Sequence, residues 1–276
     1  MTASTRREDA IAAAIQRLDD AQDRRTPCPP VRDLLPAADL GAAYAVQSGV
    51  IARRLAAGAR VIGRKIGLTN PAVQAQLGVG QPDFGVLLDD MVCAQDIPVG
   101  ITRLLQPKIE AELAFVLARD LDQAAAITEA DVAAATAHVI AALEIPDSRI
   151  RGWDITIVDT VADNASSGLL VLGDDPVPLE RIDVASVEMT MRSAGQVVSA
   201  GTGADCLGSP LAAMAWLAST ARDYRSPLRA GDIVLSGALG PMVPVTPGSQ
   251  FTATITGAGS VSACFTGLAD TTGITP

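Results

Sequence analysis

Residues 106–117 read QPKIEAELAFVL, a run in which charged and apolar side chains alternate before it becomes wholly apolar. A period of two predicts a β-strand, and it places Glu110 and Glu112 on the same face. Adjacent carboxylates repel each other. This face is therefore either exposed to solvent or part of a divalent cation site, because cations such as Mg²⁺ prefer carboxylate oxygens. The spacing alone leaves both alternatives open.

Short β-like runs recur along the chain after residue 60, separated by glycine and proline, with a hairpin expected at Ala194 and Gly195. Many strands with few helices predict an α+β protein with a mixed, β-rich body. Neither G-x-G-x-x-G nor G-x-x-x-x-G-K-[ST] occurs, which weakens nucleotide-dependent functions. The other runs are VIGRKIGL (61–68), FGVLL (84–88), VEMTMRS (187–193), QVVS (196–199), DIVLSG (232–237), FTATI (251–255) and SVSACF (260–265).

Two helices are predicted before residue 60. The first begins at the capping-box sequence Thr5–Glu8, and the second covers residues 40–58. A proline-rich stretch between them should be irregular. We expect residues 1–60 to form an N-terminal helical cap and residues 61–276 to form the β-rich domain.

Two further helices are predicted among the strands. One starts near Thr128 and includes ADVAAATAHVIAAL (130–143), and the other follows Ser209 with proline at its first position. His138 lies within the first of these helices, where we interpret it as a packing residue. Glu144 would then lie where that helix ends.

Composition narrows the classes of function. Hydrophobic residues make up 49% and charged residues 19% of the 276 residues, which is typical of a globular protein. The net charge of −10 disfavours binding to nucleic acid or to an acidic membrane. No apolar run reaches the roughly 18 residues of a membrane span, and no signal peptide is recognisable, so we expect a cytoplasmic protein with no membrane association.

The numbers of histidine and cysteine residues limit the kinds of catalytic and metal sites that the chain can form. The only histidine, His138, excludes zinc sites built on several histidines, and it excludes a Ser-His-Asp triad unless His138 serves it. The four cysteines form no CxxC pair, so we expect them to be reduced.

Five further polar residues are candidates for a site, each with an ordinary alternative. Lys65 lies between glycines, where backbone can approach a ligand closely, or it is a solvated lysine. Asp83 in QPDFG is an acid/base or a turn residue. Glu144 is a third ligand of an octahedral Mg²⁺ or Mn²⁺ site, or it is solvated. Arg149 and Ser166 bind a substrate carboxylate, or they pair with acids or cap a turn.

Six stretches, in order from about residue 50 to residue 265, together resemble the 2-hydroxypentadienoate hydratases (2-keto-4-pentenoate hydratases) of the fumarylacetoacetate hydrolase superfamily. The resemblance implies a mixed β-roll of the fumarylacetoacetase C-terminal type, with flanking helices and an N-terminal helical cap. Residues 61–276 would then be the catalytic domain of a homo-oligomer, a pentamer or decamer. The stretches are RRLAAGARVIGRKIGLTN (53–70), QPDFGVLLDDM (81–91), QPKIEAELAFVL (106–117), DSRIRGWDITIVDTVADNASSGLLVLG (147–173), LGSPLAAMAWLA (207–218) and GDIVLSGAL (231–239).

The resemblance also implies roles for single residues. The family's ligands for Mg²⁺ or Mn²⁺ fall on Glu110, Glu112 and Glu144. The lysine of its G-x-K-x-G segment falls on Lys65, the aspartate of QPDFG on Asp83, and the serine after its DNA sequence on Ser166, as a substrate contact. The family often has lysine at the position of Arg64, so the charge is kept there.

The activity implied is hydration of 2-hydroxypenta-2,4-dienoate to 4-hydroxy-2-oxopentanoate in the catabolism of aromatic meta-cleavage products. The metal would stabilise the enolate, with Lys65 or Asp83 as the acid/base and with no organic cofactor. One alternative is a 4-oxalocrotonate decarboxylase of the same superfamily. Another is a non-catalytic partner of such an enzyme. A decarboxylase of the same pathway is also a candidate partner.

Overall fold

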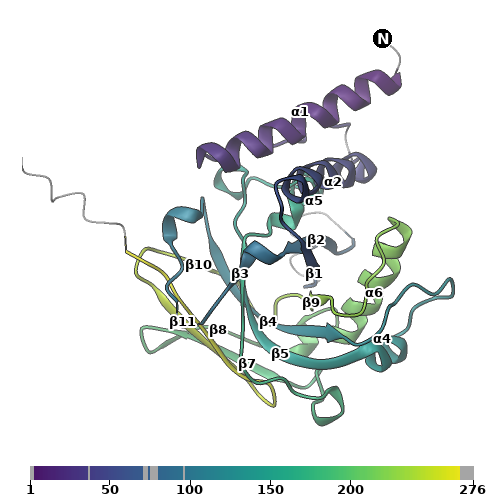
Figure 1. Ribbon diagram of the computed structural model, residues 1–276. Coiled ribbons are helices and arrows are strands. Elements are labelled where there is room, and N and C mark those ends of the chain that lie inside the picture. Colours follow the sequence, from purple (N-terminus) through teal and green to yellow (C-terminus); the bar gives the residue numbers. More distant parts are fainter. Residues whose placement is uncertain (1–2, 37, 71–73, 75–79, 96, 268–276) are drawn as a thin grey trace, which may run out of the picture.

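The computed structural model describes residues 3–36, 38–70, 74, 80–95 and 97–267, which form two sheets flanked by helices (Figure 1). The helices are α1 (Ala3–Arg24), α2 (Leu40–Ala56), α4 (Glu129–Ala135), α5 (Ile157–Ala162) and α6 (Pro210–Asp223). The strands are β1 (Val61–Gly67), β2 (Asp83–Leu88), β3 (Val92–Cys93), β4 (Lys108–Leu117), β5 (Thr136–Ile145), β6 (Leu169–Leu172), β7 (Glu188–Ser193), β8 (Gln196–Thr202), β9 (Ile233–Leu235), β10 (Val243–Pro244), β11 (Gln250–Ile255) and β12 (Gly259–Cys264).

The larger sheet has the strand order β2-β1-β9-β4-β5-β6-β3, with β10 paired to β4. It is a mixed sheet, because β1 pairs with β9 and β3 with β6 in parallel, while the other pairs are antiparallel. The predicted strand at residues 106–117 is confirmed as β4, which lies between β9 and β5. Most of the side chains of β4 and β5 are buried, so a charge on either strand needs a partner inside the protein.

The smaller sheet has the order β12-β11-β7-β8 and lies across the larger one (Figure 1). The predicted hairpin is confirmed, since Ala194 and Gly195 join β7 to β8 with positive φ values of 47° and 80°. Along β11 buried and exposed residues alternate, as expected for a sheet with one face on a core. Its buried Phe251, Ala253 and Ile255 belong to the same core as Leu113 and Phe115 of β4.

The N-terminal helices stack at one end of the molecule, where α1 packs on α2 and α2 packs on α5 (Figure 1). The irregular stretch predicted between α1 and α2 is confirmed. The predicted start of the first helix at Thr5–Glu8 is wrong, because α1 already includes Ala3. The division into a cap at residues 1–60 and a domain at residues 61–276 stays a prediction.

The predicted helix over residues 130–143 is half wrong. Helix α4 starts after its N-cap Thr128, as expected, but it ends at Ala135, and β5 begins at Thr136. His138 and Glu144 are therefore strand residues. The apolar run of β5 pairs with β4 on one side and β6 on the other, and such a buried run cannot be distinguished from a buried helix by periodicity alone.

Helix α6 begins at Pro210, as predicted, and the Oγ of its N-cap Ser209 accepts a hydrogen bond from the backbone N–H of Leu211. It packs against α4 and β1. None of the helices in the described ranges is long and apolar enough to cross a membrane.

The path of β1 depends on one glycine. A Cβ at Gly63 would lie 1.7 Å from the carbonyl oxygen of Ile233 on β9, so no other residue fits there without moving the strands apart. This close approach sets the position of Lys65, two residues further along the same strand.

Candidate active site

Three carboxylates converge where β4 and β5 pair. Glu110 lies directly opposite Glu144 in the antiparallel register, and Glu112 follows on the same face of β4. One oxygen of each carboxylate lies within 4.8 Å of the others. Glu112 and Glu144 are buried, and Glu110 is half-buried. The face of β4 that carries Glu110 and Glu112 is therefore not exposed to solvent, which was one of the two alternatives left by the sequence.

Burial and mutual repulsion make these carboxylates reluctant to ionise together. Burial and the charge of Glu144 raise the pKa of Glu110 to about 8. Burial and the charges of Glu144 and Glu110 raise the pKa of Glu112 well above its usual range. Burial also raises the pKa of Glu144, although the positive charge of Lys65 opposes this shift. Carboxylates this close are stabilised in the charged form by a cation placed among them.

The unused hydrogen-bonding capacity of the cluster fits such a cation. Glu112 Oε1 and Glu144 Oε2 are buried without a hydrogen-bond partner, and Glu144 Oε1 lies 3.3 Å from the ammonium group of Lys65. Glu112 Oε2 accepts a 2.7 Å hydrogen bond from the backbone N–H of Gly237. Buried oxygens without partners are costly. All are hard oxygen ligands of the kind that Mg²⁺, Mn²⁺ and Ca²⁺ bind, so the residues fit a divalent cation.

Lys65 and Asp83 border this cluster. The strand register pairs Asp83 with Gly67, so the Asp83 and Lys65 side chains share a face of the sheet. The Nζ of Lys65 lies 3.3 Å from Glu144 Oε1. Burial lowers the pKa of Lys65, but the charges of Glu144 and Asp83 outweigh burial and raise it above its usual value. Lys65 is therefore held as an ammonium ion.

Asp83 is fixed from two sides. Its Oδ2 accepts a 3.0 Å hydrogen bond from the hydroxyl of Thr160 on α5, while its Oδ1 is buried without a partner. A Cβ at Gly67 would lie 2.1 Å from that Oδ1, so glycine is needed beside the carboxylate. Burial raises the pKa of Asp83, although Lys65 and Thr160 oppose the shift. A raised pKa brings a carboxyl group closer to the range useful for proton transfer at neutral pH.

Some of these groups border a cavity of about 420 Å³, which is large enough for a small organic acid. Lys65, Asp83 and Glu110 line one part of it, and Ser166 lies in the wall, so the structure brings four of the predicted site residues together. The wall also contains Trp153, Ile155 and Met242, which are apolar, and the acid Asp205; its other residues are Ile66, Gly67, Leu68, Thr69, Asn70, Pro146, Thr160, Ala165, Ala200, Ala238, Gly240 and Pro241.

Ser166 reaches the cavity on an unusual loop. Asn164, Ala165 and Ser166 all have left-handed backbone, with φ values of 51° to 55°, which is uncommon outside glycine. The Asn164 side chain holds the loop against β2, because its Oδ1 accepts from the backbone N–H of Val86 and its Nδ2 donates to the carbonyl of the same residue. Such strained backbone is often retained where it serves a ligand.

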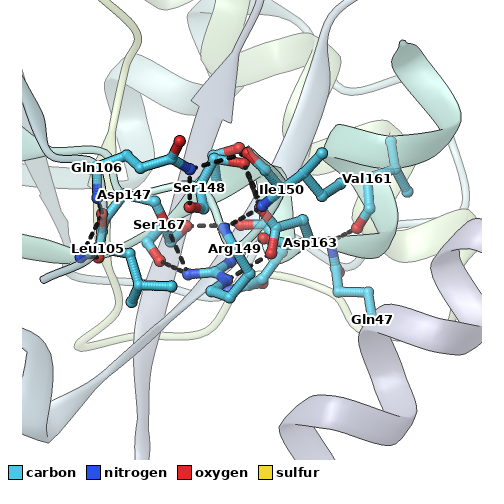
Figure 2. A network of polar contacts seen from close by, with 12 residues as sticks. Gln47, Leu105, Gln106, Asp147, Ser148, Arg149, Ile150, Val161, Asp163 and Ser167 are labelled. Carbon is cyan, nitrogen blue, oxygen red and sulfur yellow. Dashed lines mark hydrogen bonds and ion pairs between the residues drawn. The ribbon is translucent and has the colours of Figure 1, made fainter. Parts of the chain in front are cut away.

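Arg149 does not belong to the described lining of this cavity. Its guanidinium group is bound by the Asp163 carboxylate and donates to the carbonyls of Asp147, Asp163 and Ser167 (Figure 2). Ser148 donates to the same Asp163 carboxylate. In the structure Arg149 therefore pairs with an acid, which was the alternative to binding a substrate carboxylate. Its guanidinium group connects Asp163 and Ser167, which lie on either side of the left-handed loop.

The sequence of the chain is similar to those of known proteins. The sequence model of the fumarylacetoacetate (FAA) hydrolase C-terminal family matches residues 63–266. A 2-keto-4-pentenoate hydratase from Paraburkholderia phymatum is 52% identical over 258 residues, which cover 94% of this chain and 98% of the relative. The chain belongs to this hydratase family of the fumarylacetoacetate hydrolase superfamily. A 2-hydroxyhexa-2,4-dienoate hydratase from Comamonas testosteroni is 42% identical over 253 residues, covering 91% of this chain and 96% of the relative.

Solved structures of a related enzyme have the same fold as this chain. The 4-oxalocrotonate decarboxylase from Pseudomonas putida G7, complexed with magnesium and adipate, superposes with a TM-score of 0.89 at 34% identity, covering 94% of this chain and 98% of the other. The same decarboxylase with calcium and acetate gives a TM-score of 0.88 at 33% identity. The predicted family and α+β fold are confirmed, and a related protein binds divalent cations.

Three lining residues of the cavity, Trp153, Thr160 and Asp205, were not predicted from the sequence. Thr160 and Trp153 fall within the stretch that carries the resemblance, but no pattern distinguishes them from their neighbours, and Asp205 lies outside every matching stretch. Trp153 is fixed by a hydrogen bond from its Nε1 to the Gln106 carbonyl, and Lys108 Nζ lies 4.3 Å from the centre of its ring. These contacts depend on segments far apart in sequence.

The raised carboxyl pKa values predict a pH dependence. Glu110 titrates near 4.5 in an unfolded chain and at about 8 here, so between these values the folded metal-free protein holds a proton that the unfolded chain has lost. Its stability should therefore fall as the pH rises from about 5 to about 8. Because Mg²⁺ binds the carboxylate form, it should raise the melting temperature more at pH 8 than at pH 6. Thermal melts with and without Mg²⁺ test this, and an equal rise at both pH values would contradict it.

His138 provides a prediction of little effect. It lies on β5 six residues from Glu144, about 20 Å along an extended strand, and outside the described lining of the cavity. His138→Ala should leave kcat within about twofold of normal, whereas a general acid or base contributes about 10² to 10⁴-fold. A loss of that larger size in a folded variant would show that His138 handles a proton.

Proposed function

We propose that the protein adds water to 2-hydroxypenta-2,4-dienoate to give 4-hydroxy-2-oxopentanoate, in the catabolism of aromatic meta-cleavage products. The observation that supports this most is the cluster of three carboxylates with the Lys65 ammonium group and the buried Asp83 beside it, at a cavity that Lys65, Asp83 and Glu110 line. The hydratase names of relatives that match nearly the whole chain point to the same reaction.

In this proposal Glu110, Glu112 and Glu144 hold Mg²⁺ or Mn²⁺. The bound ion supplies positive charge where the negative charge of the enolate develops. The Gly237 backbone N–H fixes one oxygen of Glu112 and leaves the other for the ion. The ammonium group of Lys65 lies 3.3 Å from Glu144 Oε1 and adds a second positive charge beside the three glutamates.

Lys65 and Asp83 are the candidate proton carriers. The 2-hydroxyl of the substrate loses a proton and C5 gains one, which gives the conjugated 2-oxo-3-enoate. Water then adds its oxygen to C4 and a proton to C3. Asp83 suits the acceptance and return of a proton because its pKa is raised, and Thr160 orients it. Lys65 suits the stabilisation of negative charge, since its pKa is raised as well.

Ser166 is proposed to contact the substrate carboxylate, since the left-handed loop places it in the cavity wall. We do not assign Arg149 to the substrate, because its guanidinium group is already engaged by Asp163 and by backbone carbonyls. Its role in the proposal is to hold the loop that carries Ser166.

The charges of the cavity favour a hydratase over the decarboxylase alternative. A decarboxylase for 2-oxohex-3-enedioate must accommodate a second carboxylate at the far end of its substrate. Among the described residues of the lining, Lys65 is the only cation, and it is paired with Glu144. The lining also offers the apolar side chains of Trp153, Ile155 and Met242, which suit the uncharged vinyl terminus of the pentadienoate.

The decisive experiment follows the substrate directly. Freshly generated 2-hydroxypenta-2,4-dienoate should be converted to 4-hydroxy-2-oxopentanoate, as NMR can show, with activity lost to a chelator and restored by Mg²⁺ or Mn²⁺. The diacid 2-oxohex-3-enedioate should release little CO₂. Rapid CO₂ release without hydration would favour the decarboxylase, and a metal-loaded protein with neither activity would favour a non-catalytic partner.

Two further features belong to the proposal. A homo-oligomer, a pentamer or decamer, is expected by resemblance, and light scattering of the purified protein measures it. A cytoplasmic location and association with a decarboxylase of the same pathway are also expected, and co-purification from the native cell tests the association.

A further inference from the structure

Asp205 is an acid of the cavity wall that the proposed reaction does not use. It ends the short 3₁₀ turn Gly203–Asp205 that follows β8. Its Oδ2 accepts hydrogen bonds from both the backbone N–H and the hydroxyl of Thr202, at 2.8 and 3.1 Å. Both donors use the same oxygen, so Oδ1 takes no part in this cap. An asparagine side chain carries an equivalent carbonyl oxygen, so the cap alone does not require a negative charge.

The described part of the cavity wall contains more acidic than basic side chains. Asp83, Glu110 and Asp205 line it against a single cation, Lys65, in the described part of the wall. A divalent cation held by the glutamate cluster offsets charge at the end where the substrate's 2-oxo acid binds. Asp205 is not one of those three glutamates, and its Oδ2 lies beside Gly201, which follows the lining residue Ala200.

We propose that Asp205 is a specificity-determining residue that makes the protein prefer monocarboxylate dienoates with an uncharged far end over dicarboxylates. The proposal rests on the proposed function. In this proposal the tail of the substrate passes Asp205, whose carboxylate repels a second carboxylate there. Like charges placed together in a partly closed site cost far more than in water. Rejection by an opposing charge is a common way to achieve specificity.

The test compares ligands of equal length that differ in the far end. Kinetics use 2-hydroxyhexa-2,4-dienoate against 2-hydroxyhexa-2,4-dienedioate, and calorimetry of the Mg²⁺-loaded protein uses hexanoate against adipate. Asp205→Asn should raise the ratio of diacid to monoacid, in kcat/KM and in affinity, by about tenfold. Asp205→Glu keeps the charge and should leave the ratio near that of the unmodified protein.

A matched control places the same change elsewhere. Asp183 accepts hydrogen bonds from Ala185 N–H and the Ser186 hydroxyl in a similar local turn, but it is not among the described lining residues. Asp183→Asn should not change the ratio. In the unmodified protein, higher salt should raise the diacid-to-monoacid ratio, because the repulsion is screened; this measurement does not depend on any variant folding.

An unchanged ratio in folded Asp205→Asn would overturn the proposal, as would a ratio that is insensitive to salt in the unmodified protein. Calorimetry separates this failure from failure of the proposed reaction. If neither dienoate is hydrated but the adipate-to-hexanoate ratio still rises in Asp205→Asn, the reaction is wrong and the role of Asp205 stands.

Discussion

Glu112→Gln should fold normally and lose its affinity for Mg²⁺ by at least about 100-fold, because the affinity of such sites depends on the number of charged ligands. Glu112 is 0% exposed, and its Oε2 accepts a hydrogen bond from the Gly237 backbone N–H. The amide oxygen of glutamine can accept the same bond at almost the same volume. Replacing one of the three crowded carboxyl groups with a neutral amide also relieves their repulsion, so the metal-free variant should be at least as stable as the unmodified protein.

The measurement is the rise in melting temperature on adding Mg²⁺, together with turnover of the dienoate. The unmodified protein should show both, and Glu112→Gln should show neither. Glu188→Gln makes the same chemical change at an exposed position of β7, and it should keep the full Mg²⁺ effect. Normal Mg²⁺ stabilisation of Glu112→Gln would remove Glu112 from the ligands.

Much of the β-rich body could be predicted from sequence because its strands have local signals. The run at residues 106–117 shows its period of two directly, and the turn at Ala194 and Gly195 joins two clear strands. The family was also readable, since its motifs are long and ordered along the chain. These features depend on near neighbours in sequence, which one sequence records fully.

Other features depend on partners far along the chain. Strand β5 resembles a helix in sequence because it is buried between β4 and β6, so burial removes the alternation that marks a strand. Because β5 was predicted as a helix, the position of Glu144 relative to Glu110 could not be predicted either. Glu144 faces Glu110 only because β5 pairs with β4 in one register, and a helix ending at Glu144 would have given no such position. Likewise, Arg149 could be assigned to Asp163 only once the fold placed their segments together.

Lys65→Met should lower kcat by about 10² to 10⁴-fold, the range expected for a lost acid/base group, while stability in saturating Mg²⁺ changes far less. Lys65 is 4% exposed, with its ammonium group 3.3 Å from Glu144 Oε1. Methionine keeps an unbranched apolar stem in the same space. In saturating Mg²⁺ the proposed metal at Glu110, Glu112 and Glu144 still supplies a cation beside Glu144, so losing the ion pair with Lys65 should cost little stability.

Two companion variants separate the ways in which Lys65 can act. Lys108→Met is the matched control, since Lys108 is the chain's other lysine and lies over the Trp153 ring instead of against the carboxylate cluster, so its loss of kcat should be much smaller. Lys65→Arg keeps the positive charge but cannot release a proton near neutral pH. If it retains most of the activity, Lys65 stabilises charge and Asp83 remains the proton carrier. If both Lys65 variants are equally inactive although folded and metal-loaded, proton transfer falls to Lys65. Near-normal kinetics of Lys65→Met would contradict both roles and make Lys65 a structural partner of Glu144.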